Sequence, residues 1–80
     1  MNNTIPPLHT SEEVAHRVGD NIRSILAEQG RNLEWLAAEI GIDVQSILKQ
    51  FSEKVQLWLA LDASVYLNVP LERVLGDDRA

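Results

Sequence analysis

Residues 32–51 read NLEWLAAEIGIDVQSILKQF, and the spacing of the apolar residues in this stretch decides the fold. In its first half, apolar residues recur at the i, i+3, i+4, i+7 spacing of one helical face: Leu33, Leu36, Ala37 and Ile40. The same spacing returns in its second half: Val44, Ile47, Leu48 and Phe51. Gly41 separates the two runs, and glycine accepts backbone angles that a side chain resists. The stretch therefore predicts two short helices joined by a tight turn.

A polar residue marks the point where each of these helices begins. Asn32 precedes the first apolar run, and Asp43 precedes the second. Side-chain oxygens of Asn and Asp accept hydrogen bonds from the free N–H groups of a first helical turn, so we expect both residues to act as N-caps. The second helix is expected over residues 43–51. The centre of its apolar face is either Ile47 or Leu48, so the spacing leaves the rotation of this helix open by one residue.

A longer helix is predicted on the N-terminal side of this stretch. Residues 10–13 read TSEE, which has the form of a capping box. A single apolar stripe follows: Val14, Val18, Ile22, Ile25 and Leu26. Gly30 suits the left-handed position after a helix, so the helix is expected over residues 11–29. Residues 1–9 contain two prolines and polar neighbours, which indicates a flexible N-terminal arm.

Two more helices are predicted on the C-terminal side. Residues 55–67 are almost continuously apolar, which is typical of a helix buried all round, and Trp58 is expected in the core. The alternative is that this helix and the last one expose part of their apolar residues as a patch that a partner covers. Pro70 suits the first turn of a last short helix, which ends before Gly76. Strand-like alternation is absent from the sequence. We therefore expect an all-α fold, a compact five-helix bundle over residues 10–76, followed by a C-terminal tail at residues 77–80.

The composition is that of one small globular domain. The chain has 80 residues, of which 45% are hydrophobic and 24% are charged, and it has no cysteine. The absence of cysteine excludes disulfides and thiolate metal sites and fits a reducing compartment. No apolar run is long enough to cross a membrane, and the first residues do not resemble a secretory signal. We therefore expect a cytoplasmic protein without a membrane partner.

The polar residues do not form the pattern of an enzyme. His9 and His16 with Glu12 and Glu13 lack a further ligand for a metal site. Ser11 beside His16 and Glu12 would have neither a pocket nor an oxyanion hole. A glycine-rich phosphate loop is also missing. We expect no enzymatic activity, no cofactor, no metal and no small-molecule ligand.

The polar face of the second short helix indicates a binding function. Opposite its apolar residues it carries amides, a hydroxyl and an ammonium group: Gln45, Ser46, Lys49 and Gln50. Two short helices around a glycine-containing turn have the build of a helix-turn-helix. Its second helix enters the major groove of DNA, where such side chains bond base edges and phosphates. The alternative for these four residues is an ordinary solvated helix face.

The chain also resembles the lambda-repressor-like DNA-binding domains, a family that includes phage repressors and Cro proteins. The resemblance is carried by VGDNIR at residues 18–23, WLAAEIGI at residues 35–42 and LNVPLERVL at residues 67–75. It covers residues 14–75. It implies five helices with residues 43–51 as the recognition helix. It also implies a sequence-specific regulator of transcription that binds an operator in double-stranded DNA and acts as a repressor.

The sequence departs from the family pattern at several positions. Leu33 stands where the family has a polar residue, Leu26 where it often has arginine, and Glu53 where glycine is common. The local positive groups are then few: Arg31, Lys49, Lys54 and, as a further candidate, Arg23. We therefore expect weak binding by one domain, compensated by a weak homodimer through helices four and five. The expected dimer contacts are Leu57, Leu61, Leu71 and Val74.

The predicted DNA-contacting residues are Arg31, Asn32, Asp43, Gln45, Ser46, Lys49, Gln50 and Lys54. For Asn32 and Asp43 the alternative role is that of helix caps. For Arg31 and Lys54, which flank the motif, the alternative is that they are ordinary surface charges without a ligand. A rival function is a protein-interaction module of the same fold that has lost DNA binding, such as an antitoxin-like domain or a repressor antagonist. The net charge of −5 favours this rival, because it repels nucleic acid at long range. RNA binding is a weaker alternative, because the sequence lacks the aromatic residues on which the bases of single-stranded RNA stack.

Overall fold

The computed structural model describes residues 11–76, and within them the chain forms five helices and no strand. The helices are α1 (Ser11–Glu28), α2 (Leu33–Ile40), α3 (Val44–Ser52), α4 (Leu57–Leu67) and α5 (Leu71–Leu75). The prediction of an all-helical chain with five helices is confirmed. The expected arm at residues 1–9, the Thr10 cap and the tail at residues 77–80 lie outside the described residues.

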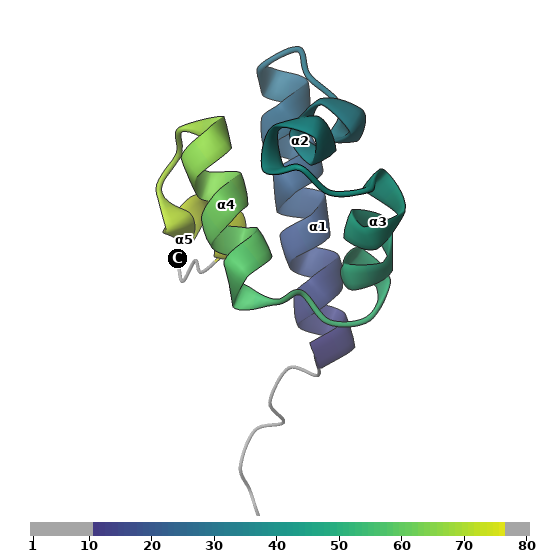
Figure 1. Ribbon diagram of the computed structural model, residues 1–80. Coiled ribbons are helices and arrows are strands. Elements are labelled where there is room, and N and C mark those ends of the chain that lie inside the picture. The colour runs from purple at the N-terminus through teal and green to yellow at the C-terminus, as the bar shows by residue number, and fades with distance from the viewer. Residues whose placement is uncertain (1–10, 77–80) are drawn as a thin grey trace, which may run out of the picture.

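The longest helix, α1, organises the other four. It contacts α3, α4 and α5, while α2 contacts α3 and α4. Figure 1 shows α3 on one side of α1 and the pair α4 and α5 on the other, with α2 across the upper end. The outer surface of α3 therefore points away from α4.

The turn between α2 and α3 has the backbone geometry that the sequence predicted. Gly41 has a φ of 90°, and its N–H donates to the carbonyl of Ala37 at 2.8 Å. The next N–H, of Ile42, donates to the same carbonyl at 3.0 Å. Because an L-residue is strained at this positive φ, the glycine allows α3 to start only a few residues after α2 ends.

The two predicted N-caps differ in the structure. The side-chain oxygen of Asn32 accepts a hydrogen bond from the N–H of Trp35 at 2.9 Å, so this cap is confirmed. Asp43 occupies the N-cap position of α3, but its side chain makes no capping hydrogen bond. The prediction of a capping role for the Asp43 side chain was therefore wrong, and α3 begins without a side-chain cap.

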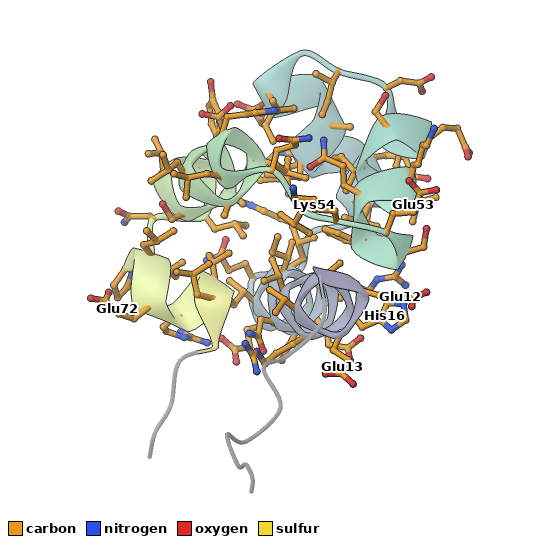
Figure 2. The ribbon with its side chains drawn as sticks, turned by 90° about the horizontal axis from the view of Figure 1, so that it is seen from below. Glu12, Glu13, His16, Glu53, Lys54 and Glu72 are labelled. Atoms are coloured by element: carbon orange, nitrogen blue, oxygen red, sulfur yellow. The ribbon has the colours of Figure 1, made fainter. Side chains whose placement is uncertain are left out.

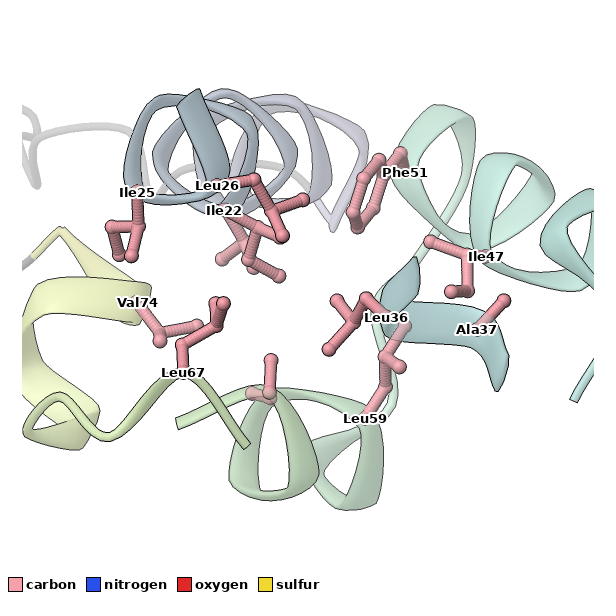
Figure 3. Close-up of a cluster of buried hydrophobic side chains, with 13 residues drawn as sticks. Ile22, Ile25, Leu26, Leu36, Ala37, Ile47, Phe51, Leu59, Leu67 and Val74 are labelled. Atoms are coloured by element: carbon pink, nitrogen blue, oxygen red, sulfur yellow. The ribbon is translucent and has the colours of Figure 1, made fainter. Parts of the chain in front are cut away.

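The hydrophobic core receives side chains from all five helices. Figure 3 shows Ile22 of α1, Leu36 of α2 and Leu67 of α4 pointing into one centre. Ile47 of α3 is fully buried, whereas Leu48 is half-buried, so the apolar face of α3 runs through Ile47. The buried hydrophobic residues are Ala15, Val18, Ile22, Ile25, Leu26, Leu36, Ala37, Ile47, Phe51, Leu59, Ala60, Ala63, Leu67 and Val74.

Helix α4 is apolar all round in sequence but is buried on one side only. Its exposed residues are Leu57 at 65%, Trp58 at 44%, Leu61 at 42%, Val65 at 70% and Tyr66 at 40%, and together they are called the α4 apolar face. The prediction that this helix is fully buried, with Trp58 in the core, was wrong. The reason is architectural, since among residues 11–76 no further helix lies outside α4 to cover it.

Helix α5 does not share this exposure. Val74 is fully buried and Leu71 is half-buried. The prediction of Val74 as a dimer contact was therefore wrong, because its side chain is packed in the core of the same chain. Its carbonyl also accepts a hydrogen bond from Nδ2 of Asn21 at 3.0 Å, which ties α5 to α1. Across residues 11–76, none of the helices has the length and hydrophobicity needed for a transmembrane span.

Candidate nucleic-acid interface

The outer side of α3 presents the polar residues that the sequence singled out. Gln45, Ser46 and Lys49 are exposed, whereas Ile47 and Phe51 are buried on the opposite side. The division follows from the helical rotation of about 100° per residue, which places positions 45, 46 and 49 together. The exposed side of α3 therefore offers an amide, a hydroxyl and an ammonium group to a ligand.

A hollow with a volume of about 370 Å³ lies beside the start of α3. Its polar lining comes from three helices and the loop before α2: Arg23, Arg31, Asn32, Glu34 and Gln45. Its apolar lining is Leu26, Ala27, Leu33, Val44 and Leu48. The fold therefore brings Gln45 of α3 beside the adjacent pair Arg31 and Asn32, so three of the predicted contact residues line one hollow.

Trp35 holds Arg31 in place at the edge of the hollow. The guanidinium carbon of Arg31 lies 4.0 Å from the centroid of the Trp35 ring, a cation–π contact. The Arg31 Nη1 atom also donates to the side-chain carbonyl of Gln29 at 3.2 Å. Because the Asn32 side chain accepts from the Trp35 backbone, these residues form one connected cluster. The sequence did not reveal this role of Trp35, although a spacing of four residues from Arg31 is a usable signal.

Arg23, which the sequence offered as a further positive group but not among the predicted contact residues, also lines the hollow. Its side chain is exposed, and its guanidinium carbon lies 5.7 Å from the centroid of the Phe51 ring. Arg23 lies three residues before Leu26, so both occupy neighbouring positions on α1 and both line the hollow. Arg23 therefore adds a second guanidinium to the hollow.

Gln50 has a structural role that the sequence did not indicate. It is half-buried, and its side-chain carbonyl accepts a hydrogen bond from the backbone N–H of Gln56 at 2.8 Å. Gln56 is the N-cap residue of α4, so this bond supports the start of that helix. The carbonyl oxygen of Gln50 is therefore engaged within the protein, unlike the side chains of Gln45 and Ser46.

Lys54 and Asp43 lie at different ends of α3. Asp43 is exposed at the beginning of the helix, close to Gln45 in sequence. Lys54 is exposed on the segment between α3 and α4 (Figure 2). The fold does not bring Lys54 to the hollow, because the whole length of α3 separates the two.

The local charge around α2 and α3 is not positive. Residues 31–54 contain three basic and four acidic residues. Glu34 lines the hollow, and Glu53 directly precedes Lys54 in the sequence. Arg73 is paired with an acid, since its Nη2 atom lies 3.2 Å from Oε1 of Glu28 in a salt bridge. Any attraction for an anion must therefore come from the positions of a few cationic groups rather than from a broad basic surface.

The described residues offer no metal site. Figure 2 shows Glu12 and His16 near each other on α1, but no group of three or more His, Asp or Glu residues suited to a metal occurs in residues 11–76. Comparison with models of protein families, with characterised proteins and with solved structures found no match for this chain. A function is therefore inferred from the exposed side of α3 and the hollow beside it.

Proposed function

We propose that this protein binds specific sequences in double-stranded DNA through α2 and α3, used as a helix-turn-helix, and that it represses transcription. The observation that carries the proposal is the gathering of Arg23, Arg31, Asn32 and Gln45 around one hollow at the start of α3. A helix with an exposed polar side and cationic groups at its base matches what a major groove and its phosphates require.

Base recognition is assigned to the exposed side of α3. The amide of Gln45 can form the paired hydrogen bonds that identify adenine, and the ammonium of Lys49 can donate to guanine or to a phosphate. Ser46 can bond either type of base edge. All three side chains are exposed on a helix whose other side is anchored by Ile47 and Phe51. The helix thus presents its polar groups from a fixed support.

Phosphate binding is assigned to the residues around the start of α2. Arg31 is oriented by Trp35, and Arg23 lies across the same hollow. The first N–H groups of α2 carry the partial positive charge of a helix N-terminus, which favours a phosphate near Asn32. A guanidinium held in position loses less side-chain entropy on binding a phosphate. These groups compensate in part for the negative net charge of the chain.

Selection of bound duplexes from a random library tests this proposal. At about 50 mM salt we expect enrichment of a short consensus, with affinity falling as salt rises, because phosphate contacts release counterions. The double substitution Gln45→Ala and Lys49→Ala should remove the enrichment and leave the circular dichroism spectrum unchanged. The matched control is Ser24→Ala, an exposed position on α1. Absence of any enrichment with the unmodified chain would refute DNA recognition.

A second candidate is a protein-interaction module that uses this fold without binding DNA. The net charge of −5 and the apolar residues Leu26 and Leu33 in the hollow favour it. Under this alternative the hollow would receive an apolar side chain of a partner protein instead of a phosphate. The library selection separates the two functions, since only the first predicts a consensus.

A further inference from the structure

From the hollow beside the start of α3 we infer that this protein binds a small monocarboxylic acid with an apolar chain, and that the bound acid competes with DNA. The binding of the acid rests on the hollow alone, whereas the competition rests on the proposed function. The expectation from the sequence is that no small molecule binds. Only the fold brings the lining residues of α1, α2 and α3 together around one hollow.

The apolar lining of the hollow calls for a ligand with a hydrocarbon part. Leu26 is 2% exposed, and Leu33, Val44 and Leu48 are half-buried, so these side chains are less exposed than the polar groups around them. The volume of about 370 Å³ lies in the range of sites that bind small molecules, roughly 300–1,000 Å³. Such sites combine an apolar lining with a few polar groups that fix the orientation of the ligand. A phosphate group has no apolar surface with which to cover this lining.

The charges around the hollow favour a ligand with one negative charge. Within residues 11–76, the charged residues that line it are Arg23, Arg31 and Glu34, and all three are exposed. Two positive charges and one negative charge leave one positive charge in excess, which a carboxylate balances. A phosphate monoester carries about 1.5–2 negative charges at neutral pH and exceeds this balance. A carboxylate on a short hydrocarbon chain therefore matches both the charge and the lining.

Arg31 is the residue that is best placed to hold the carboxylate. Its guanidinium carbon lies 4.0 Å from the centroid of the Trp35 ring, and its Nη1 atom donates to Gln29 at 3.2 Å, so its position is restrained before a ligand binds. A guanidinium has five N–H donors, and this bond uses one of them. The others can form the paired hydrogen bonds that match the two oxygens of a carboxylate. The side-chain oxygen of Asn32 caps α2, so the amide nitrogen of Asn32 is the atom that can donate to a ligand.

The bound acid would occupy the groups that the proposed function assigns to DNA phosphates. A guanidinium that holds a carboxylate is not free to bind a phosphate, and this applies to both Arg31 and Arg23. In simple competition, a ligand at about ten times its dissociation constant raises the apparent dissociation constant for DNA about elevenfold. The protein would then release DNA when the acid accumulates.

Octanoate is the probe for binding, followed by the amide chemical shifts of the isotope-labelled full chain. We expect saturable shifts at residues 31–34 and 44–48 and none at the α4 apolar face, which is the control for nonspecific contact with a hydrocarbon chain. From hexanoate to octanoate the affinity should rise about two- to fourfold per methylene, because burial of one methylene contributes about 0.8 kcal/mol. Octanamide, which lacks the charge, should bind about fivefold more weakly or worse.

Two results of this titration would overturn the inference. One is the absence of saturable shifts with octanoate up to about 10 mM. The other is a set of shifts confined to the α4 apolar face. N-acetyl-leucine separates a free acid from the C-terminus of a peptide, since it carries a peptide group beside its carboxylate. It should bind more weakly than hexanoate, and tighter binding would assign the hollow to a peptide and contradict the proposal.

Exposed charged residues can be substituted to test the carboxylate contact without disturbing the core. Arg31→Gln should weaken octanoate binding about fivefold or more, because it removes the paired hydrogen bonds. Glu34→Gln should strengthen it about twofold, because it removes a repelling charge beside the hollow. Lys54→Gln removes one positive charge away from the hollow and is the matched control, with unchanged octanoate binding. Circular dichroism checks that each variant is folded. Equal weakening by Arg31→Gln and Lys54→Gln would overturn the inference.

Competition is measured with a duplex selected as described for the proposed function. Octanoate at about ten times its dissociation constant should weaken duplex binding about tenfold, while octanamide at the same concentration should have a much smaller effect. Shifts at the hollow in a chain that binds no duplex would refute the proposed function and support the acid site. Duplex binding that octanoate leaves unchanged, although it saturates the hollow, would overturn the competition.

Discussion

Gly19 of α1 provides the space that the ring of Phe51 of α3 occupies. A Cβ atom at position 19 would lie 2.8 Å from Cγ of Phe51 and 3.0 Å from its Cδ2. Real Cβ atoms do not approach a ring carbon so closely, and Phe51 is almost fully buried. The absence of a methyl group at Gly19 thus allows the close approach of α1 and α3. This approach also fixes the position of the exposed side of α3.

Gly19→Ala is expected to destabilise the protein although alanine favours helices. Helix propensity contributes about 1 kcal/mol in favour of alanine, while overpacking against a buried ring costs about 1–3 kcal/mol. We therefore expect a net loss of free energy of unfolding, measured by urea denaturation, with weaker DNA binding because α3 is displaced. Ser24→Ala, which meets no neighbouring helix, should be neutral or slightly stabilising. A Gly19→Ala variant of unchanged or increased stability would contradict the close approach.

Asn32→Ala and Asp43→Ala form a matched pair at the starts of α2 and α3. The side chain of Asn32 makes a capping hydrogen bond to Trp35, and that of Asp43 makes none. Loss of an N-cap costs about 1 kcal/mol, so the first substitution should lower the free energy of unfolding by about this amount and the second by much less. Thermal or urea denaturation measures the difference. Equal losses would show that the capping bond is not what distinguishes the two sites.

Arg31→Ala is expected to weaken DNA binding uniformly across sequences. The proposed partner of Arg31 is a phosphate, so its removal should reduce the slope of log affinity against log salt by about 1. Fluorescence anisotropy with a labelled duplex at several salt concentrations measures this slope. Trp35→Leu should produce a smaller loss of affinity, since Arg31 keeps its charge but loses the ring on which it lies. An unchanged salt slope in Arg31→Ala would exclude the phosphate contact.

Gln45→Ala is expected to change sequence preference instead of the salt slope. A bidentate contact to one base contributes about 1–3 kcal/mol of discrimination, so preference at one position of the consensus should disappear. Repeating the library selection with this variant measures the effect. Gln50→Ala serves as the comparison, because the Gln50 carbonyl already binds the N–H of Gln56. If loss of preference follows Gln50→Ala instead, base recognition lies further along α3 than proposed.

The sequence predicted the helices well because their boundaries depend on local chemistry. The expected helix over residues 11–29 is α1, Ser11–Glu28, and the expected start of α2 after Asn32 is confirmed by its capping bond. Gly41 has the positive φ that its place in the turn required. Such features involve neighbours within a few residues, which a single sequence displays directly.

The parts that the sequence did not predict depend on tertiary contacts. Trp58 is exposed because no other helix of residues 11–76 lies outside α4, and no periodicity in an apolar helix reveals which side has neighbours. The place of Arg23 at the hollow follows from the crossing of α1 over α3. The pairing of Gln50 with Gln56 depends on the path of a loop. The role of α2 and α3 as a DNA-binding unit stays a prediction that the experiments above address.

The two tryptophans give this chain a pair of built-in optical probes. Trp35 lies under the Arg31 guanidinium at the hollow, and Trp58 is 44% exposed on α4. Emission of an indole moves to shorter wavelength when water leaves it, so the signal of each ring reports a different event. With Trp58→Phe the remaining fluorescence would report a ligand that covers the hollow, and with Trp35→Phe it would report a partner that covers the α4 apolar face. Both equilibria can therefore be titrated without attaching a dye.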